Sequence, residues 1–166
     1  MTAEIKLTKG KVALVDAADV AWLSKWKWHI NKKGYAVRTS SRKDGKLHTI
    51  FMARLIMGLE FGDPRYVDHI NSIPADNRRS NLRVCVPAEN NRNCKVRSDN
   101  KSGFKGVHWH KSNRRWQASI RLDGSLKFLG YHETAEMAAK AYDAAAKDLF
   151  GEFAKLNFPE VSNVYS

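Results

Sequence analysis

Hydrophobic and polar positions in the first thirty residues form two short strand-like runs and then change to a helical spacing. The stretch IKLTKGKVALVDAADVAWLSKWKWHI places the two runs on either side of a turn at Lys9-Gly10. Asp16 follows as a residue type that caps helices, so the pattern predicts a helix over 17–26. Three tryptophans are expected to pack in the core: Trp22, Trp26 and Trp28. The spacing of four residues places Trp22 and Trp26 on one helical face.

The next segment, GYAVRTSSRKDGKLHTIFMARLIM, has the pattern of a β-hairpin. Hydrophobic and polar residues alternate over 35–39, and Asp44-Gly45 is a dipeptide typical of tight turns. The returning strand is predicted over 47–52.

Residues 64–93 predict a strand, a long loop, a second strand and a helix. RYVDHI and RVCV are strand-like, and the polar stretch NSIPADNRRSNL between them is an ordered loop. Pro87 in PAENNRN is placed at the first turn of a helix.

A second unit is predicted over 102–159, after a polar stretch without periodicity that suits a linker over 94–101. Three short strands, GFKGVHWHK, RRWQASIRL and SLKFLGY, are separated by turns at Ser112-Asn113 and Asp123-Gly124. A helix follows between an N-cap at Thr134 and a stop at Gly151. Its expected sheet-facing stripe consists of Ala138, Ala141, Tyr142, Ala145 and Leu149.

The middle strand of this unit alternates apolar and polar side chains. Trp116, Ala118 and Ile120 can pack on the helix, which leaves the other face polar and cationic through Arg115, Gln117, Ser119 and Arg121. Lys105 is expected to add a positive charge to the same face from the first strand. Such a sheet fits the major groove of double-stranded DNA, although a half-solvated sheet that is basic by chance has the same pattern.

The charge of the chain supports a polyanionic partner. The formal net charge is +12, and 95–121 carries eight basic residues against one acid, whereas 133–160 carries six acids against three lysines. Nucleic acid is the favoured partner, membrane headgroups are a weaker alternative, and RNA is a distant one.

Composition removes several other classes of protein. No apolar run has the roughly 20 residues that a bilayer span needs, and the first residues lack the apolar core of a signal peptide. Cys85 and Cys94 are too few for a disulfide framework or a four-cysteine zinc site, so both are expected to be reduced thiols. We expect a soluble protein of the cytoplasm.

The stretch VDHINSIPADNRRSNLRVCVPAENN contains the residue types that phosphodiester hydrolysis needs. Asp68 offers a hard carboxylate ligand, His69 an imidazole that titrates near neutral pH, and Asn81 and Asn90 amide oxygens. A polar loop whose residues only cap turns has a similar composition, and the pair Asp68-His69 alone does not decide between the two interpretations.

The order of these residues resembles the ββα-metal finger of HNH endonucleases, especially homing enzymes of phages and introns. The resemblance rests on VDHIN, DNRRSNLR and the closing EN, with Asn81 twelve and Asn90 twenty-one positions after His69, as in the H-N-H-N subgroup. It implies that Asp68 and Asn90 bind one divalent metal, magnesium or manganese, that His69 is the general base, and that Asn81 fixes the loop and the orientation of His69. It places Arg78, Arg79 and Arg83 near phosphates, and leaves Asn77, Asn91 and Asn93 as structural or DNA-contacting alternatives.

One position departs from this family. This chain has MARLIMG where relatives often have MHRLIMG, so that Ala53 stands at a position where a histidine is common. The lost histidine could support the active site or a phosphate. An inactive nuclease fold that only binds DNA is therefore the alternative to an active enzyme.

Residues 102–159 resemble the APETALA-two domain of plant ethylene-response factors. The resemblance rests on the Gly106-Val107 step, on FLGYHETAEMAAKAYDAAA and on the closing AKLNFP. It implies a three-stranded sheet in the major groove, with contacts from Lys105, His108, His110, Arg115, Ser119, Arg121 and Phe128. Leu126 stands where that family often has a base-contacting arginine, so the plant target sequence is not implied.

These observations predict an α+β protein in two parts. Residues 1–93 form the nuclease region with its finger at about 64–93, 94–101 a linker, 102–159 a sheet packed on one helix, and 160–166 a tail. The expected activity is metal-dependent hydrolysis of DNA. One finger per chain favours nicking of one strand by a monomer without an obligate protein partner, in a phage-infected bacterial host cell.

Overall fold

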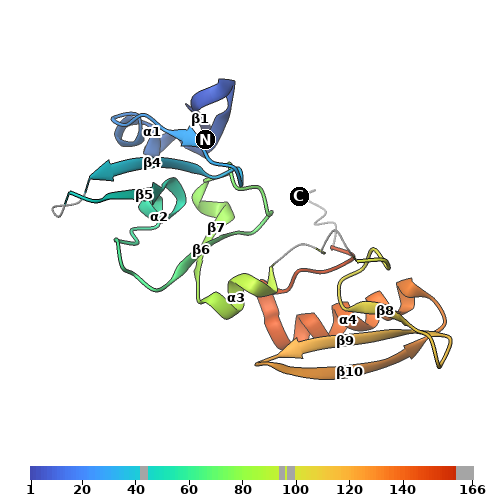
Figure 1. Cartoon of the computed structure of the whole chain (residues 1–166). Coiled ribbons are helices and arrows are strands. Elements are labelled where there is room, and N and C mark those ends of the chain that lie inside the picture. Colours follow the sequence, from blue (N-terminus) through green and yellow to red (C-terminus); the bar gives the residue numbers. More distant parts are fainter. Residues whose placement is uncertain (42–44, 94–95, 97–99, 160–166) are drawn as a thin grey trace. The chain divides into compact units, whose positions relative to one another are not determined.

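The computed structural model describes residues 1–41, 45–93, 96 and 100–159. The chain divides into two compact units, Met1–Asn90 and Asn91–Ser166 (Figure 1). The described residues of the first unit form three small antiparallel sheets and those of the second unit form one, each with few helices, so the fold class is α+β, as predicted. Among the helices of the described residues, none is long and apolar enough to cross a membrane. The turn at Asp44, Cys94 and most of the expected linker lie outside the described residues.

The elements up to residue 92 are β1 (Thr2–Lys6), β2 (Val12–Asp16), α1 (Ala17–Leu23), β3 (His29–Ile30), β4 (Ala36–Ser41), β5 (Leu47–Phe51), α2 (Met52–Ile56), β6 (Tyr66–His69), β7 (Leu82–Cys85) and α3 (Pro87–Arg92). The strands pair as β1-β2, β3-β4-β5 and β6-β7, all antiparallel. Apolar side chains from these elements form one core, which includes Val15, Leu23, Met52 and Leu82.

The first helix is shorter than the sequence pattern predicts. It ends at Leu23, so Trp26 is not helical and lies 36% exposed, with the Arg38 guanidinium 4.5 Å from its ring centroid. Trp28 is buried, as expected, because its indole Nε1 can donate to the Leu23 carbonyl at the end of the helix. The placement of Trp22 and Trp26 on one helical face was therefore wrong.

Strand β6, strand β7 and helix α3 follow one another in the predicted order. Asp68 pairs with Arg83 and His69 with Leu82 across the two strands. Successive side chains of a strand point to opposite faces, which separates Asp68 from His69. Loop 70–81 between the strands is anchored on β2, where Leu14 N donates to Ala75 O at 2.9 Å and Asn77 N donates to Leu14 O at 2.7 Å.

The second unit consists of β8 (Val107–His110), β9 (Arg115–Leu122), β10 (Ser125–His132) and α4 (Ala135–Phe150). The strand order is β10-β9-β8, and α4 packs on one face of this sheet (Figure 1). Thr134 caps α4 by accepting a hydrogen bond from Met137 N, and Gly151 ends the helix with a positive φ of 50°, as predicted. Asp123 and Gly124 both have positive φ, which suits a two-residue hairpin turn.

Two details of this unit differ from the predicted pattern. The buried side of α4 contains Ala138, Ala139, Tyr142, Asp143, Ala146 and Phe150, so Ala141, Ala145 and Leu149 lie only at its margin. Strand β8 begins at Val107, which leaves Lys105 outside the sheet.

The closing segment AKLNFP is tied to the start of the sheet by partly buried polar contacts. Asp143 on α4 accepts hydrogen bonds from the backbone of Asn157 and Phe158, and the Asn157 amide bonds both backbone groups of Lys105. Gly106 lies between these layers with φ of 74°, and a Cβ there would come within 2.0 Å of Tyr142. Only glycine fits this position.

Candidate active site and nucleic-acid interface

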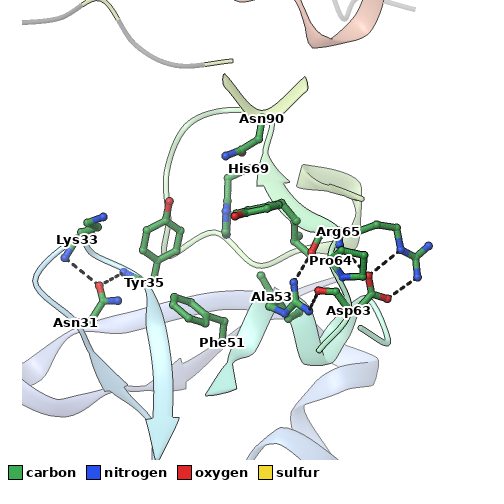
Figure 2. A pocket seen from close by; sticks show the side chains of 13 residues that line it. Asn31, Lys33, Tyr35, Phe51, Ala53, Asp63, Pro64, Arg65, His69 and Asn90 are labelled. Carbon is green, nitrogen blue, oxygen red and sulfur yellow. Dashed lines mark hydrogen bonds and ion pairs between the residues drawn. The ribbon is translucent and has the colours of Figure 1, made fainter. Parts of the chain in front are cut away.

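A cavity of about 540 Å³ in the first unit brings together residues from four parts of the chain (Figure 2). Its lining consists of Asn31, Lys33, Tyr35, Phe51, Ala53, Arg54, Asp63, Pro64, Arg65, Tyr66, Val67, His69 and Asn90. His69 on β6 and Asn90 on α3 share this wall, and the Tyr35 ring stands edge-on to the His69 ring at 5.7 Å. Two of the four predicted catalytic and metal-binding residues therefore lie in one cavity.

His69 is almost completely buried, and its protonation is defined by its surroundings. Its Nε2 lies 3.1 Å from Asn77 Oδ1, an oxygen that can only accept, so this contact favours the tautomer with the proton on Nε2 and the basic lone pair on Nδ1. Burial lowers the pKa of His69 below its ordinary value, while the Asn77 hydrogen bond and the charges of Asp68 and Asp76 act against that shift. The imidazole is therefore neutral at pH 7, the state in which it can take a proton.

Asn81 holds the loop that carries Asn77. Its side-chain amide donates to Asp76 O at 2.7 Å, and its Oδ1 accepts from Asn71 N at 3.0 Å. The Asp76 carboxylate also accepts from the Asn71 amide and from Arg78. Because Asn77 follows Asp76 directly, these contacts fix the position of the side chain that meets His69.

The predicted metal ligands are oxygen donors of the type that magnesium and manganese take. Asp68 is 7% exposed, and its Oδ2 accepts from Nε and Nη2 of Arg83 at 2.9 and 2.7 Å. Asn90 faces the cavity, whereas Asp68 is not among its lining residues. Within the described residues, no three side chains of His, Cys, Asp or Glu gather in a group suited to a metal ion. The donor types fit a divalent cation, with Asp68 sharing its carboxylate with Arg83.

The three arginines expected near phosphates are paired with acids in this structure. Arg78 binds Asp76, Arg79 binds Asp19, and Arg83 binds Asp68, with closest distances of 2.6 to 2.8 Å. The Arg79 hydrogen bond lowers the pKa of Asp19, and the Arg78 hydrogen bond lowers that of Asp76. Asp16 does not cap α1 with its side chain, because its carboxylate accepts from Arg79 N instead.

Other residues of the site were not singled out from the sequence. The sequence pattern gives Asn77 only as an alternative, because nothing in its spacing distinguishes it from its neighbours. Lys33, exposed at the cavity, lies on a turn that Asn31 organises by accepting from Lys33 N and Tyr35 N. Arg54 donates to the carbonyls of Glu60, Asp63 and Arg65 and so holds the segment that leads into β6.

Ala53 also lines the cavity that contains His69 and Asn90 (Figure 2). It is 6% exposed and lies on α2, next to Met52 in the core. A larger side chain at this position would extend toward the cavity, so residue 53 is part of the same site as His69.

In the second unit, the face of the sheet opposite α4 gathers most of the predicted DNA-contacting residues. We call it the outer face. Directly paired residues of antiparallel strands lie on the same face. The register pairs His108 with Gln117, His110 with Arg115, Ser119 with Phe128, Arg121 with Leu126, and Gln117 with Tyr131.

The members of this face differ in accessibility. Arg115, Arg121 and Phe128 are exposed, although Arg115 is paired with Glu133 at 2.9 Å and Arg121 donates to Gly124 O. Ser119 is only 8% exposed, below its larger neighbours. Lys105 lies outside the face, and its Nζ donates to Arg92 O at 2.5 Å.

Comparison with known proteins shows relatives of both parts. No family model matches the chain. An uncharacterised HNH endonuclease of Acanthamoeba polyphaga mimivirus is 35% identical over 149 residues, which cover 90% of this chain and 76% of that protein. Protein 3.8 of Escherichia phage T7 is 32% identical over 90 residues, 54% of this chain and 74% of that protein.

The C-terminal part has plant relatives. An ethylene-responsive transcription factor of Arabidopsis thaliana is 42% identical over 71 residues, 42% of this chain and 38% of that protein. The mimivirus protein matches nearly the whole chain, and the plant protein matches less than half of it. The chain therefore belongs to the HNH endonuclease family and carries a C-terminal part related to the APETALA-two/ethylene-response factors.

Proposed function

We propose that this protein is a metal-dependent endonuclease that hydrolyses double-stranded DNA. One observation carries the proposal: His69, whose pKa is lowered by burial and whose ring is oriented by Asn77, shares a cavity with Asn90. A general base must be unprotonated and correctly oriented when it meets the water; the lowered pKa of His69 favours the unprotonated ring, and the contact with Asn77 supports its orientation. The relationship to HNH endonucleases supports the same chemistry.

In this proposal His69 takes a proton from the attacking water through Nδ1, and Asn77 keeps the opposite nitrogen protonated. Asn81 acts as a positioning residue, because it fixes the loop behind Asn77. A divalent metal, magnesium or manganese, held by Asp68 and Asn90, would supply stabilisation of the charge that develops on the phosphate oxygens. Lys33 provides a positive charge at the cavity to hold the DNA backbone.

The outer face of the second unit would position the enzyme on its target by entering the major groove. Its exposed Arg115 and Arg121 and the +12 charge of the chain support this assignment. Among the described residues, His69 and Asn90 lie in the same cavity, and a single hydrolytic centre of this kind in each chain would nick one strand as a monomer. The viral origin of two relatives supports a role inside an infected cell. The homing-type role rests on the resemblance of the VDHIN and DNRRSNLR motifs to homing enzymes.

The test is relaxation of supercoiled plasmid by the full chain with magnesium, with manganese and with EDTA. Nicking is expected with a metal and not with EDTA, and His69→Ala should reduce the rate by about a hundredfold or more, the usual contribution of a general base. His48→Ala is the matched control, because His48 lines a different cavity and should keep its activity. Unchanged nicking by His69→Ala would refute the assignment of the base.

A second candidate is a sequence-specific DNA-binding protein whose nuclease fold is inactive. Ala53 favours it, because it replaces a potential imidazole in the wall of the His69 cavity. Ala53→His separates the two candidates in the same assay. Nicking by the unaltered chain excludes the inactive protein, nicking only after Ala53→His supports it, and no nicking by either chain with any metal excludes the enzyme.

A further inference from the structure

The outer face is less charged than a surface that contacts only phosphates, because an apolar band crosses it along β10. Leu126 is 59% exposed, Phe128 53% and Tyr131 42%. The Phe128 and Tyr131 rings lie 4.9 Å apart, and the His110 ring lies 5.1 Å from Tyr131. We call Leu126, Phe128 and Tyr131 the apolar band.

The charges of this face lie around the band. Arg121 is paired directly with Leu126, and Arg115 lies on β9 opposite His110. Neutral polar side chains, Gln117 and Ser119, stand opposite Tyr131 and Phe128. Exposed apolar patches bordered by polar residues mark interaction sites, and the cations select a polyanion as the partner.

We propose that the apolar band recognises the C5-methyl groups of thymine in the major groove. The inference rests on the proposed function, because it specifies which DNA the second unit binds. The thymine methyl is the apolar group that a base pair presents in that groove, whereas arginine and lysine bind the guanine edge. An exposed leucine and an exposed phenylalanine cannot hydrogen-bond to a base edge, but they can exclude water from a methyl group.

Deoxyuridine tests this directly, because it differs from thymidine only by the missing methyl. The preferred duplex is first selected from a random library with the full chain in EDTA, which separates binding from cleavage. Binding is then compared between that duplex and the same duplex with every thymidine replaced by deoxyuridine. Affinity should fall about fourfold for each contacted methyl, the factor expected for one buried carbon group.

Variants connect the effect to the band. Leu126→Ala and Phe128→Ala should bind the thymidine duplex more weakly and lose the difference between the two duplexes. Arg121→Ala should weaken binding to both duplexes by the same factor, since phosphate contacts do not depend on the methyl group.

Three outcomes overturn the inference. Equal affinity of the unaltered chain for the two duplexes refutes methyl recognition and leaves the proposed function standing. Failure to select any duplex refutes both. A concentration-dependent dimer that Leu126→Ala dissociates would assign the band to a second copy of this chain.

Discussion

The loop between β6 and β7 and the outer face of the second unit use polar side chains in opposite ways. In the loop, Asp76, Asn77 and Asn81 are at least 93% buried and bond to the loop backbone, to Arg78 or to His69. On the outer face, Arg115 and Arg121 remain exposed. A general base must be oriented and neutral before the substrate arrives, so the groups that hold it are buried. A surface that binds a duplex needs exposed side chains that can reach the phosphates and the base edges.

This difference predicts how each region responds to substitution. The buried groups of the loop depend on one another, so one change should disturb both stability and catalysis. The side chains of the outer face should act almost independently, provided that the sheet and helix beneath them are intact.

The largest effect is expected below the outer face, at Gly106. Gly106→Ala places a Cβ 2.0 Å from Tyr142 Cδ2 and 2.6 Å from Ser119 O on a backbone with positive φ. We expect a loss of roughly 3 kcal/mol or more in the free energy of unfolding of the second unit. Thermal unfolding of the full chain measures it.

Gly124→Ala is the control for this prediction. Its φ is 83°, but no atom lies within 4 Å of the added Cβ, so it carries the backbone strain without the clash. Equal destabilisation by the two variants would show that strain, and not the contact between sheet and helix, is responsible.

The next largest effect is expected in the loop, from Asp76→Asn. This change removes the charge that binds Arg78, and we expect a loss of roughly 2 kcal/mol in the free energy of unfolding at pH 7. The pKa of Asp76 is lowered in the folded state, so its contribution is present above the unfolded value of about 3.9 and disappears as the pH falls through the folded pKa. Urea unfolding at pH 7 and at lower pH measures the free energy of unfolding of the unaltered chain and of Asp76→Asn. The difference between the two values should become smaller as the pH is lowered. A difference that stays constant with pH would contradict the role of this charge.

A smaller effect, on catalysis, is expected from Asn77. Asn77→Ala should slow nicking by about 10- to 100-fold, because the tautomer and orientation of His69 are no longer fixed. The hydrogen bond that Asn77 Oδ1 accepts raises the pKa of His69, so its loss should move the acidic limb of the pH–rate profile to lower pH. Asn77→Asp should move that limb to higher pH, because it adds a negative charge beside the ring.

The control for Asn77 is Asn113→Ala, on an exposed turn of the second unit, which should leave the rate profile unchanged. Shifts of the limb in the same direction for Asn77→Ala and Asn77→Asp would contradict the assigned contact.

The smallest effect is expected from one cation of the outer face. Arg121→Ala should reduce DNA affinity by a few fold. The slope of the logarithm of the binding constant against the logarithm of the salt concentration should become shallower by about one, as expected for one lost phosphate contact. Lys140→Ala removes the same charge from an exposed position on α4 and should leave the slope unchanged. Equal effects of the two variants would mean that net charge, and not the face, drives binding.

Much of the fold follows from local patterns. Alternation of apolar and polar residues gives β5, β6, β7, β9 and β10 to within two residues at each end, and Thr134 and Gly151 set the ends of α4. The period of two along β9 also places Arg115, Gln117 and Arg121 on one face. The pattern was less accurate where tertiary packing overrides it, as in α1, which ends three residues early because Trp28 packs on its last turn.

The sequence by itself determined the order of the elements and the residue types of the candidate site. Only the tertiary structure decided which of these residues meet. Asn77 contacts His69, Arg79 is held by Asp19 some sixty positions earlier, and Asp68 is paired with Arg83 and is not among the residues that line the His69 cavity. Local patterns report the spacing of side chains along one element. These contacts depend instead on the hydrogen bonds that anchor loop 70–81 on β2, and those bonds join segments about sixty positions apart in the chain.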